Sequence, residues 1–224
     1  MKSISNVNPH DFLERCEATR VEHRTMDFEG RQYAIPYSTI QIGEDKLEGL
    51  RENEERIDLL RNIISNNAAS PMVHLDIGSN LGVFVESLKD MFEASAGVDA
   101  DPYYIDQCHF LYPDTESVFH LCDLNETTLG EKFDGLFDVI TALSMLEYIK
   151  DKETFITDLY KLTDQVCIVE GHSEDIIKGL DLQYESMLEV QPWTVTRMEE
   201  TTDVGINAPL ATVRTGRPIW MCVK

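Results

Sequence analysis

The segment Val73 to Gly82, which reads V-H-L-D-I-G-S-N-L-G, holds the residues best suited to chemistry. Asp76 ends a short, mostly apolar run, and Gly78 and Gly82 follow it. Such a run is typical of a parallel strand buried on both faces, and glycines permit a tight turn with close backbone approach to a ligand. The segment therefore predicts a strand, a turn and a helix that together bind an adenosine-type ligand.

Glu147, Tyr148 and His172 are the side chains that could move a proton. Each is expected in a loop after the carboxyl end of a strand, where open α/β sheets bind their ligands. A lone loop histidine such as His172 is often an ordinary surface residue, and Tyr148 could pack or line a pocket instead of ionising. His74 lies inside a strand, and His109 and His120 have no partner at metal-ligand spacing, so we expect no metal.

Alternating strands and helices position these residues. Strands are expected at Met72 to Asp76, Ala94 to Asp99, Val118 to Cys122, Phe137 to Ala142 and Gln165 to Glu170, with helices after Gly82, from Pro102 and from Asp151. This order requires a mostly parallel sheet with helices on both faces. The predicted class is α/β, a doubly wound sheet of seven strands once the two strands at the end of the chain are added.

The two ends of the chain have a different pattern. Residues 1–70 predict a helical and hairpin cap, and residues 71–224 the ligand-binding domain. The cap would hold a helix from Asn8-Pro9, a hairpin turning at Glu29-Gly30 and a helix from Asn53 to Ser65 with Arg56 facing outward. Strands at Trp193 to Met198 and Ile219 to Val223, joined by a loop from Thr201 to Arg217, should be antiparallel, with the last one closing an edge.

Charge and composition restrict the partners. The 19 basic and 41 acidic residues give a formal net charge of −22 without a basic cluster, which argues against nucleic acid. A soluble acidic surface is the simplest interpretation, and adaptation to high salt is the other. Five cysteines without a C-x-x-C pair indicate a reduced protein. No signal peptide or membrane span is evident, so we expect a cytoplasmic protein.

The glycine spacing discriminates between two classes of ligand. The dinucleotide fingerprint G-x-G-x-x-G does not fit G-S-N-L-G, which disfavours a nicotinamide-dependent reductase. The stretch instead resembles motif I of the class I S-adenosylmethionine-dependent methyltransferases, D/E-x-G-x-G-x-G, with Asn80 at the middle glycine. Asparagine is the residue other than glycine best able to adopt a left-handed conformation, so the turn is expected to persist.

The resemblance covers about Met72 to Glu170 and implies specific contacts. Asp99 would accept hydrogen bonds from both ribose hydroxyls, and Asp123 would meet the adenine amino group. Phe137 to Ile149 looks like motif IV, in which many members carry His where Tyr148 stands. By the same resemblance, the cofactor would also contact Ser79, Ala100, Leu124 and Leu143. Each acidic residue could instead cap a turn or a helix.

The resemblance implies a methyltransferase that transfers a methyl group from S-adenosylmethionine to an O, N or C atom of a small molecule, mainly by alignment and proximity. Tyr37, Arg51 and Trp193 are the candidates for acceptor binding, and Arg51 could pair with a carboxylate of cofactor or acceptor. The alternative is a catalytically weak or inactive methyltransferase-like binding or regulatory protein, since Asn80 and Tyr148 depart from the family pattern. The acceptor and the oligomeric state stay open.

Overall fold

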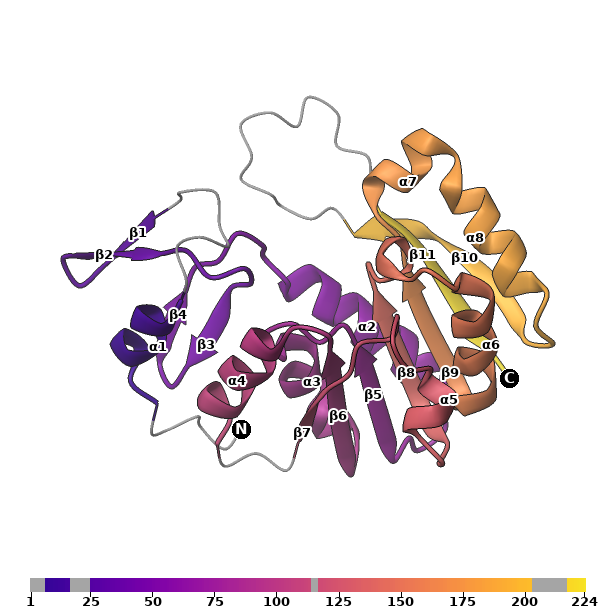
Figure 1. Cartoon of the computed structure of the whole chain (residues 1–224), viewed down its shortest axis with the longest axis horizontal. Coiled ribbons are helices and arrows are strands. Elements are labelled where there is room, and N and C mark those ends of the chain that lie inside the picture. The colour runs from indigo at the N-terminus through magenta and orange to yellow at the C-terminus, as the bar shows by residue number, and fades with distance from the viewer. Residues whose placement is uncertain (1–6, 17–24, 114–116, 203–216) are drawn as a thin grey trace.

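A seven-stranded sheet forms the centre of the computed structural model, which describes residues 7–16, 25–113, 117–202 and 217–224 (Figure 1). Its strand order is β10-β11-β9-β8-β5-β6-β7. Five strands are parallel: β5 (Val73–Ile77), β6 (Ala94–Asp99), β7 (Val118–Leu121), β8 (Phe137–Leu143) and β9 (Thr163–Glu170). The predicted doubly wound fold is confirmed. The strand order reverses between β5 and β8, and open α/β sheets bind ligands at the carboxyl ends of such strands.

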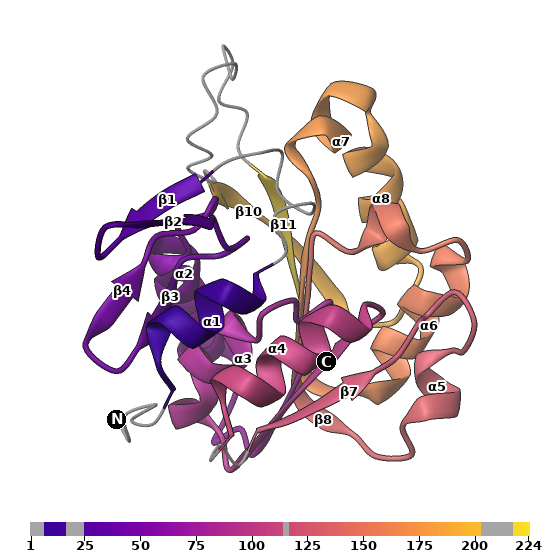
Figure 2. The ribbon, with the colours of Figure 1, turned by 60° about the vertical axis from the view of Figure 1, so that its left-hand side comes forward.

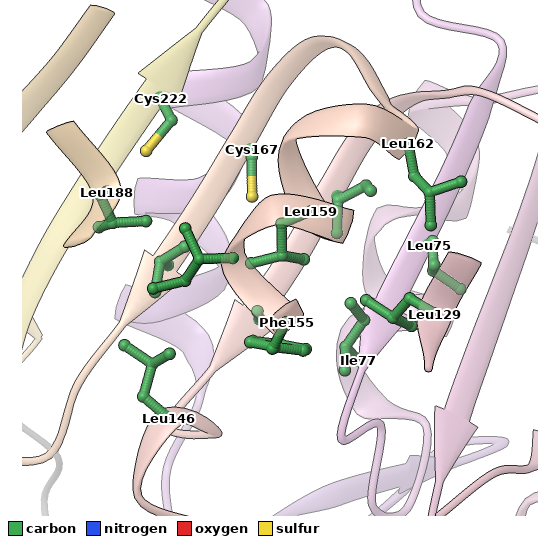
Figure 3. Close-up of a cluster of buried hydrophobic side chains, with 14 of the residues drawn as sticks. Leu75, Ile77, Leu129, Leu146, Phe155, Leu159, Leu162, Cys167, Leu188 and Cys222 are labelled. Atoms are coloured by element: carbon green, nitrogen blue, oxygen red, sulfur yellow. The ribbon is translucent and has the colours of Figure 1, made fainter. Parts of the chain in front are cut away.

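Helices cover both faces of this sheet because successive side chains of each strand point to opposite sides. Leu75 and Ile77 of β5 face α5 (Leu129–Lys132) and α6 (Lys152–Leu162), and α8 (Leu180–Glu189) covers the same side of the sheet at β11, where Leu188 lies beside Cys222 (Figure 3). Val166 and Ile168 of β9 face α2 (Glu54–Asn67) and α3 (Val83–Leu88). α4 (Pro102–Leu111), capped by the Asp101 side chain, contacts β6 and β7. Both faces of the central strands are therefore buried, which fixes their ends in place.

The N-terminal residues form the small structure predicted from sequence and one further hairpin (Figure 2). α1 (Pro9–Arg15) begins at Asn8, whose side chain accepts the N–H of His10. β1 (Thr25–Phe28) and β2 (Arg31–Ala34) pair across Glu29 and Gly30, both with positive φ. The second hairpin, β3 (Ile40–Ile42) and β4 (Asp45–Leu47), has strands of only three residues, too short for its alternating pattern to stand out. The division of the chain at residue 70 stays a prediction. α2, which precedes that residue, packs on the central sheet.

Arg56 is a correction to the sequence interpretation. It was expected to face outward on α2, but it is only 5% exposed. Arg56, Leu60 and Ile63 are spaced by four and three residues, which places them on one face of the helix. An arginine is buried only where it has a partner, and the sequence pattern does not identify a buried partner for Arg56. That pattern therefore placed Arg56 on the exposed face of the helix.

The C-terminal strands complete the sheet. β10 (Thr194–Thr202) and β11 (Arg217–Val223) are antiparallel to each other, and β11 is antiparallel to β9. The last strand therefore lies between β9 and β10, and the expectation that it closes the edge is wrong, because β10 does so. Most of the predicted connecting loop, residues 203–216, falls outside the described residues. In the described part, no helix is long and apolar enough to cross a membrane.

Candidate functional site

The connection between β5 and α3 is a tight turn built on left-handed residues. φ is +76° at Gly78, +49° at Asn80 and +71° at Gly82. A left-handed conformation costs most residues roughly 1–2 kcal/mol, and glycine and asparagine tolerate it best. The expectation that Asn80 preserves the turn is confirmed. The side chain of Met145 lies where a Cβ at Gly78 would project, so a larger residue would have to displace it and would also be strained by the positive φ.

Asp99, at the end of β6, binds this turn. Its Oδ2 accepts the backbone N–H of Asn80 at 2.8 Å, and its Oδ1 accepts the N–H of Asp101 at 2.9 Å. Burial raises the pKa of this half-buried carboxyl. Each carboxylate oxygen has a second lone pair. Asp99 can therefore accept two further hydrogen bonds, such as those of a ribose diol.

Asp76 lies beneath the turn in a line of three hydrogen-bonded side chains. Thr141 Oγ1 donates to Asp76 Oδ1 at 2.6 Å and lies 3.0 Å from His74 Nε2, which donates to it if the proton is on that nitrogen. Asp76 Oδ2 is buried and has no partner among the described residues. Burial raises the pKa of Asp76 to about 7, although the Thr141 hydrogen bond and the charge of Arg56 oppose the rise. A cationic group reaching Oδ2 would stabilise the ionised form.

The other candidates for cofactor binding lie along the same edge of the sheet. The Oγ of Ser79 is buried without a partner within the described chain. Asp123 follows β7, is exposed and accepts the N–H of Asn125 at 2.9 Å. Ala100 is exposed and follows Asp99, while Leu124 and Leu143 are partly buried against the core. Because β5, β6 and β7 are adjacent and parallel, Asp76, Asp99 and Asp123 end neighbouring strands in that order.

A buried ion-pair cluster, which the sequence analysis missed, lies at the ends of β8 and β9. Glu170 is 1% exposed and accepts two hydrogen bonds from Arg56, from Nη2 at 2.7 Å and from Nε at 3.2 Å. Ser144 Oγ donates to the same carboxylate at 2.7 Å. Arg217, 3% exposed, donates through Nη1 to Ser144 Oγ and, at 3.3 Å, to Glu170. Glu170 is an acidic residue at the end of a strand, like Asp76 and Asp99, and this position in the sequence was the signal that could have marked it as a functional residue.

The three predicted catalytic candidates lie together beside this cluster. His172 Nε2 is 2.8 Å from Glu147 Oε1 and 3.3 Å from the carbonyl oxygen of Ser144. Burial and the charge of Arg217 lower the pKa of His172, which favours the neutral imidazole. The ring of Tyr148 packs edge-on against His172 at 6.0 Å between centroids. Tyr148 is 60% exposed, and its partial burial together with the hydrogen bond and charge of Glu147 raises its pKa to about 12, so its hydroxyl stays protonated at neutral pH.

Two of the three acceptor candidates also reach this place. The guanidinium carbon of Arg51 lies 4.7 Å from the ring centroid of Tyr37. Burial, followed by the charge of Arg217, lowers the pKa of Arg51 to about 10. The charges of Tyr37 and Arg51 also act on the pKa of Tyr148. Arg51 lies just before α2, the helix whose Arg56 binds Glu170 at the carboxyl end of β9.

Trp193 is not brought to this site. It precedes Thr194, which pairs with Val223, and Val223 pairs with Val166 near the start of β9. This is the amino end of the parallel strands. Trp193 Nε1 donates to the carbonyl of Leu188 at 2.8 Å, and the ring packs in the core. Its expected role in acceptor binding does not fit this position, because a buried tryptophan at a strand start serves packing.

Within the described ranges, no group of three or more His, Cys, Asp or Glu side chains could hold a metal ion. The cysteines in this part of the chain are free, and Cys108, Cys122, Cys167 and Cys222 are buried.

Comparisons with known proteins agree with this geometry. A family model described as a methyltransferase domain matches residues 75–166, which include the turn, Asp99, Asp123 and Glu147. No curated protein sequence matches the chain significantly. Among solved structures, the N-methyltransferase NodS from Bradyrhizobium japonicum WM9 aligns with a TM-score of 0.58 at 15% identity, over 77% of this chain and 96% of NodS.

Two further structures show the same arrangement. NodS in complex with S-adenosyl-L-homocysteine aligns with a TM-score of 0.58 at 14% identity, over 76% of this chain and 86% of that one. The bifunctional kinase-methyltransferase WbdD aligns with a TM-score of 0.57 at 18% identity, over 79% of this chain and 40% of WbdD. At such identities, these likenesses show the fold alone.

Proposed function

We propose that this chain, whose residues 75–166 form a class I methyltransferase domain, transfers the methyl group of S-adenosylmethionine to a small-molecule acceptor. The hydrogen bond between Asn80 and Asp99 carries the proposal. It joins the glycine turn to the carboxylate that the sequence pattern assigns to the ribose. A pyrophosphate-binding turn would require a different glycine spacing.

The residues present fit this cofactor. Asp99 would accept the ribose hydroxyls, and Asp123 would accept a hydrogen bond from the adenine amino group. The unpaired Oδ2 of Asp76 would accept the ammonium group of the methionine moiety. A buried carboxylate oxygen without a partner costs free energy, and a cationic ligand removes that cost. The complex of NodS with S-adenosyl-L-homocysteine supports this choice of ligand.

The chain's own residues would bind, orient and move a proton. When bound, S-adenosylmethionine supplies an activated methyl carbon. Alignment of the two reactants is the main contribution of the protein. Nε2 of the neutral His172 faces the Glu147 carboxylate and the Ser144 carbonyl, so it would carry the ring proton, and Nδ1 would take a proton from a hydroxyl or ammonium acceptor. Glu147 would orient the imidazole and stabilise its charged form. Tyr148 would act as a hydrogen-bond donor, because its pKa is about 12.

Asn80 and Tyr148 depart from the family pattern, but the glycine turn and the candidate proton acceptor are both present. Asn80 keeps the left-handed backbone of the turn, and His172 comes from the next strand end to the side of Tyr148. These observations favour an active enzyme over a binding or regulatory protein with the same fold. The acceptor atom, oxygen, nitrogen or carbon, is left open by the geometry.

The proposal is tested by following the methyl group. The protein is incubated with methyl-tritiated S-adenosylmethionine and pooled small alcohols, amines and carbon acids, each pool with and without a carboxylate or phosphate group, and S-adenosylhomocysteine release is measured in parallel. We expect label in at least one pool, matched by S-adenosylhomocysteine and abolished by Asp99→Ala. Asp134→Asn, a change of an exposed carboxylate, should retain transfer. Cofactor binding without transfer to any pool would support the binding protein instead.

A further inference from the structure

We propose that the methyl acceptor carries an oxyanion, a carboxylate or a phosphate, and that Arg51 and Arg217 bind it beside the cofactor. This inference rests on the proposed methyl transfer and adds the chemical class of the substrate. Arg56 and Arg217 meet at the carboxylate of Glu170, and Arg51 lies just before α2, the helix that carries Arg56.

The three arginines are not equally paired. Arg56 forms a two-bond contact with Glu170, and Arg217 shares an oxygen of that same carboxylate. Arg51 forms no ion pair with any carboxylate of the described residues, and its guanidinium packs against the ring of Tyr37. The hydrogen bonds of Arg217 within the described chain run through Nη1, whereas a guanidinium has five N–H donors on three nitrogens. Arg51 and Arg217 therefore retain donors for a ligand.

The arrangement holds like charges together. Arg217 and Arg56 both contribute to the lowered pKa of Arg51, after burial. Glu170 offsets part of the repulsion between these cations, because its charge raises the pKa of Arg51, and an oxyanion placed beside Arg51 and Arg217 would offset more of it. Guanidinium groups bind carboxylate and phosphate through paired N–H donors, which fixes the orientation of the ligand as well as its charge.

The place of these arginines suits an acceptor. Arg217 contacts Ser144, and the next residue, Met145, lies against Gly78 of the glycine turn. His172 is within reach of the Ser144 carbonyl, and the charges of Arg217 and Arg51 act on it. An anionic group bound by Arg51 and Arg217 would thus lie between the turn and the proton-accepting pair. The remainder of the acceptor can then face the donated methyl group.

The total charge of the protein makes this site selective. With a net charge of −22, the surface as a whole repels anions. Free donors on two arginines at one edge of the sheet provide a local attraction. An acceptor without a negative charge would leave these donors unpaired, and the site would therefore discriminate against neutral analogues.

The carboxylate of the cofactor's methionine moiety is the competing occupant. The test therefore uses protein saturated with S-adenosylhomocysteine, whose own carboxylate is already bound. Calorimetric titrations compare benzoate and phenyl phosphate with the neutral benzamide. We expect at least one of the two anions to bind about tenfold or more tightly than benzamide, and the tighter one identifies the oxyanion.

Variants locate the binding. Arg51→Gln should weaken binding of that anion about tenfold or more, and Arg51→Lys should weaken it less because the charge remains. Arg31→Gln is the matched control, since Arg31 is exposed on the β1–β2 hairpin and its partner Glu14 is 3.6 Å away. This control should bind the anion as the unmodified protein does.

Two results would overturn the inference. One is binding of benzoate and phenyl phosphate only to protein free of S-adenosylhomocysteine, which would assign the arginines to the cofactor's carboxylate. The other is equal binding by Arg51→Gln and the unmodified protein, or no binding by either. Failure of S-adenosylhomocysteine itself to bind would contradict the proposed function instead, so the two failures are distinguishable.

Discussion

The backbone N–H of Asn80 donates a 2.8 Å hydrogen bond to Oδ2 of Asp99. This contact joins the turn after β5 to the end of β6, two places separated by 19 residues in sequence. Asp99 therefore has two roles in the account: it holds the turn, and it offers its remaining lone pairs to the ribose.

Asp99→Ala should reduce the affinity for S-adenosylhomocysteine by about two orders of magnitude or more. Two hydrogen bonds to a charged group are lost, each worth roughly 1.5–3 kcal/mol. Calorimetric titration measures the effect, with Asp134→Asn as control because Asp134 is exposed in a loop. Unchanged affinity in Asp99→Ala would remove the ribose assignment.

Asn80 should tolerate glycine but not a β-branched residue. Its φ of +49° is available to Asn80→Gly without strain, whereas Asn80→Val should destabilise the protein by about 1–3 kcal/mol. Urea denaturation of both variants gives the free energies of unfolding. Equal stability of the two variants would show that the left-handed turn is not maintained in solution.

The fold could be predicted from sequence because its signals are local. Apolar runs that end at Asp76 and Asp99 mark β5 and β6, one helix begins at Pro102 as expected, and Asp151 caps another where expected. The order of these elements allows few topologies. The position of β11 inside the sheet could not be read in this way, since pairing between distant strands leaves little trace in either segment.

The arginine cluster could not be predicted for a related reason. Arg56 and Glu170 are 114 residues apart, and each looks like an ordinary charged residue in its own segment. Arg56 lies on the apolar face of its helix, where a charge is acceptable only because Glu170 meets it. Trp193 shows the opposite error: an aromatic residue considered for acceptor binding belongs to the core.

Asp76 predicts a pH dependence of cofactor binding. Burial raises its pKa to about 7, and binding of an ammonium group requires the ionised form. Affinity for S-adenosylhomocysteine should therefore fall as pH decreases below about 7, approaching tenfold for each pH unit. Calorimetric titrations at intervals of about one pH unit, from about pH 5.5 to about pH 8, measure how the affinity changes with pH. Asp76→Asn should bind weakly at every pH and show no such slope.

The same pKa predicts the opposite effect on the unliganded protein. The folded-state pKa lies above the ordinary value of 3.8, so protonation of Asp76 favours the folded state. That contribution is present at low pH and is lost as pH rises through about 7. Asp76→Asn should remove the loss and raise the melting temperature at pH 8 relative to the unmodified protein. A lower melting temperature for Asp76→Asn at this pH would contradict the buried, unpaired carboxylate.

Glu170 should be critical for stability. Glu170→Gln leaves Arg56 and Arg217 buried without their shared carboxylate, which should cost about 3–5 kcal/mol of unfolding free energy. The control is Asp90→Asn, which breaks the exposed contact with Arg61 and should cost about 1 kcal/mol or less. Urea denaturation compares the two. Similar costs would mean that the cluster is solvated in solution.

His172 should set the acidic limit of methyl transfer to an acceptor that must lose a proton. Because burial and Arg217 lower its pKa, the rate should begin to fall only below pH 6.5, the ordinary value for histidine. Glu147 raises the pKa of His172, so Glu147→Gln should move this limit to still lower pH. The pH profile of the turnover rate measures both shifts. A profile unaffected by Glu147→Gln would separate this pair from catalysis.

The decisive experiment is the binding of S-adenosylhomocysteine, measured by calorimetry and thermal shift on the unmodified protein and on Asp99→Ala. We expect one saturable site in the unmodified protein, with stabilisation of about 2.7 kcal/mol at a ligand concentration one hundred times the Kd. Most of this stabilisation should be lost in Asp99→Ala at the same concentration. Absence of heat and of any thermal shift at millimolar ligand would contradict the assignment of the turn between Asp76 and Gly82 to this cofactor.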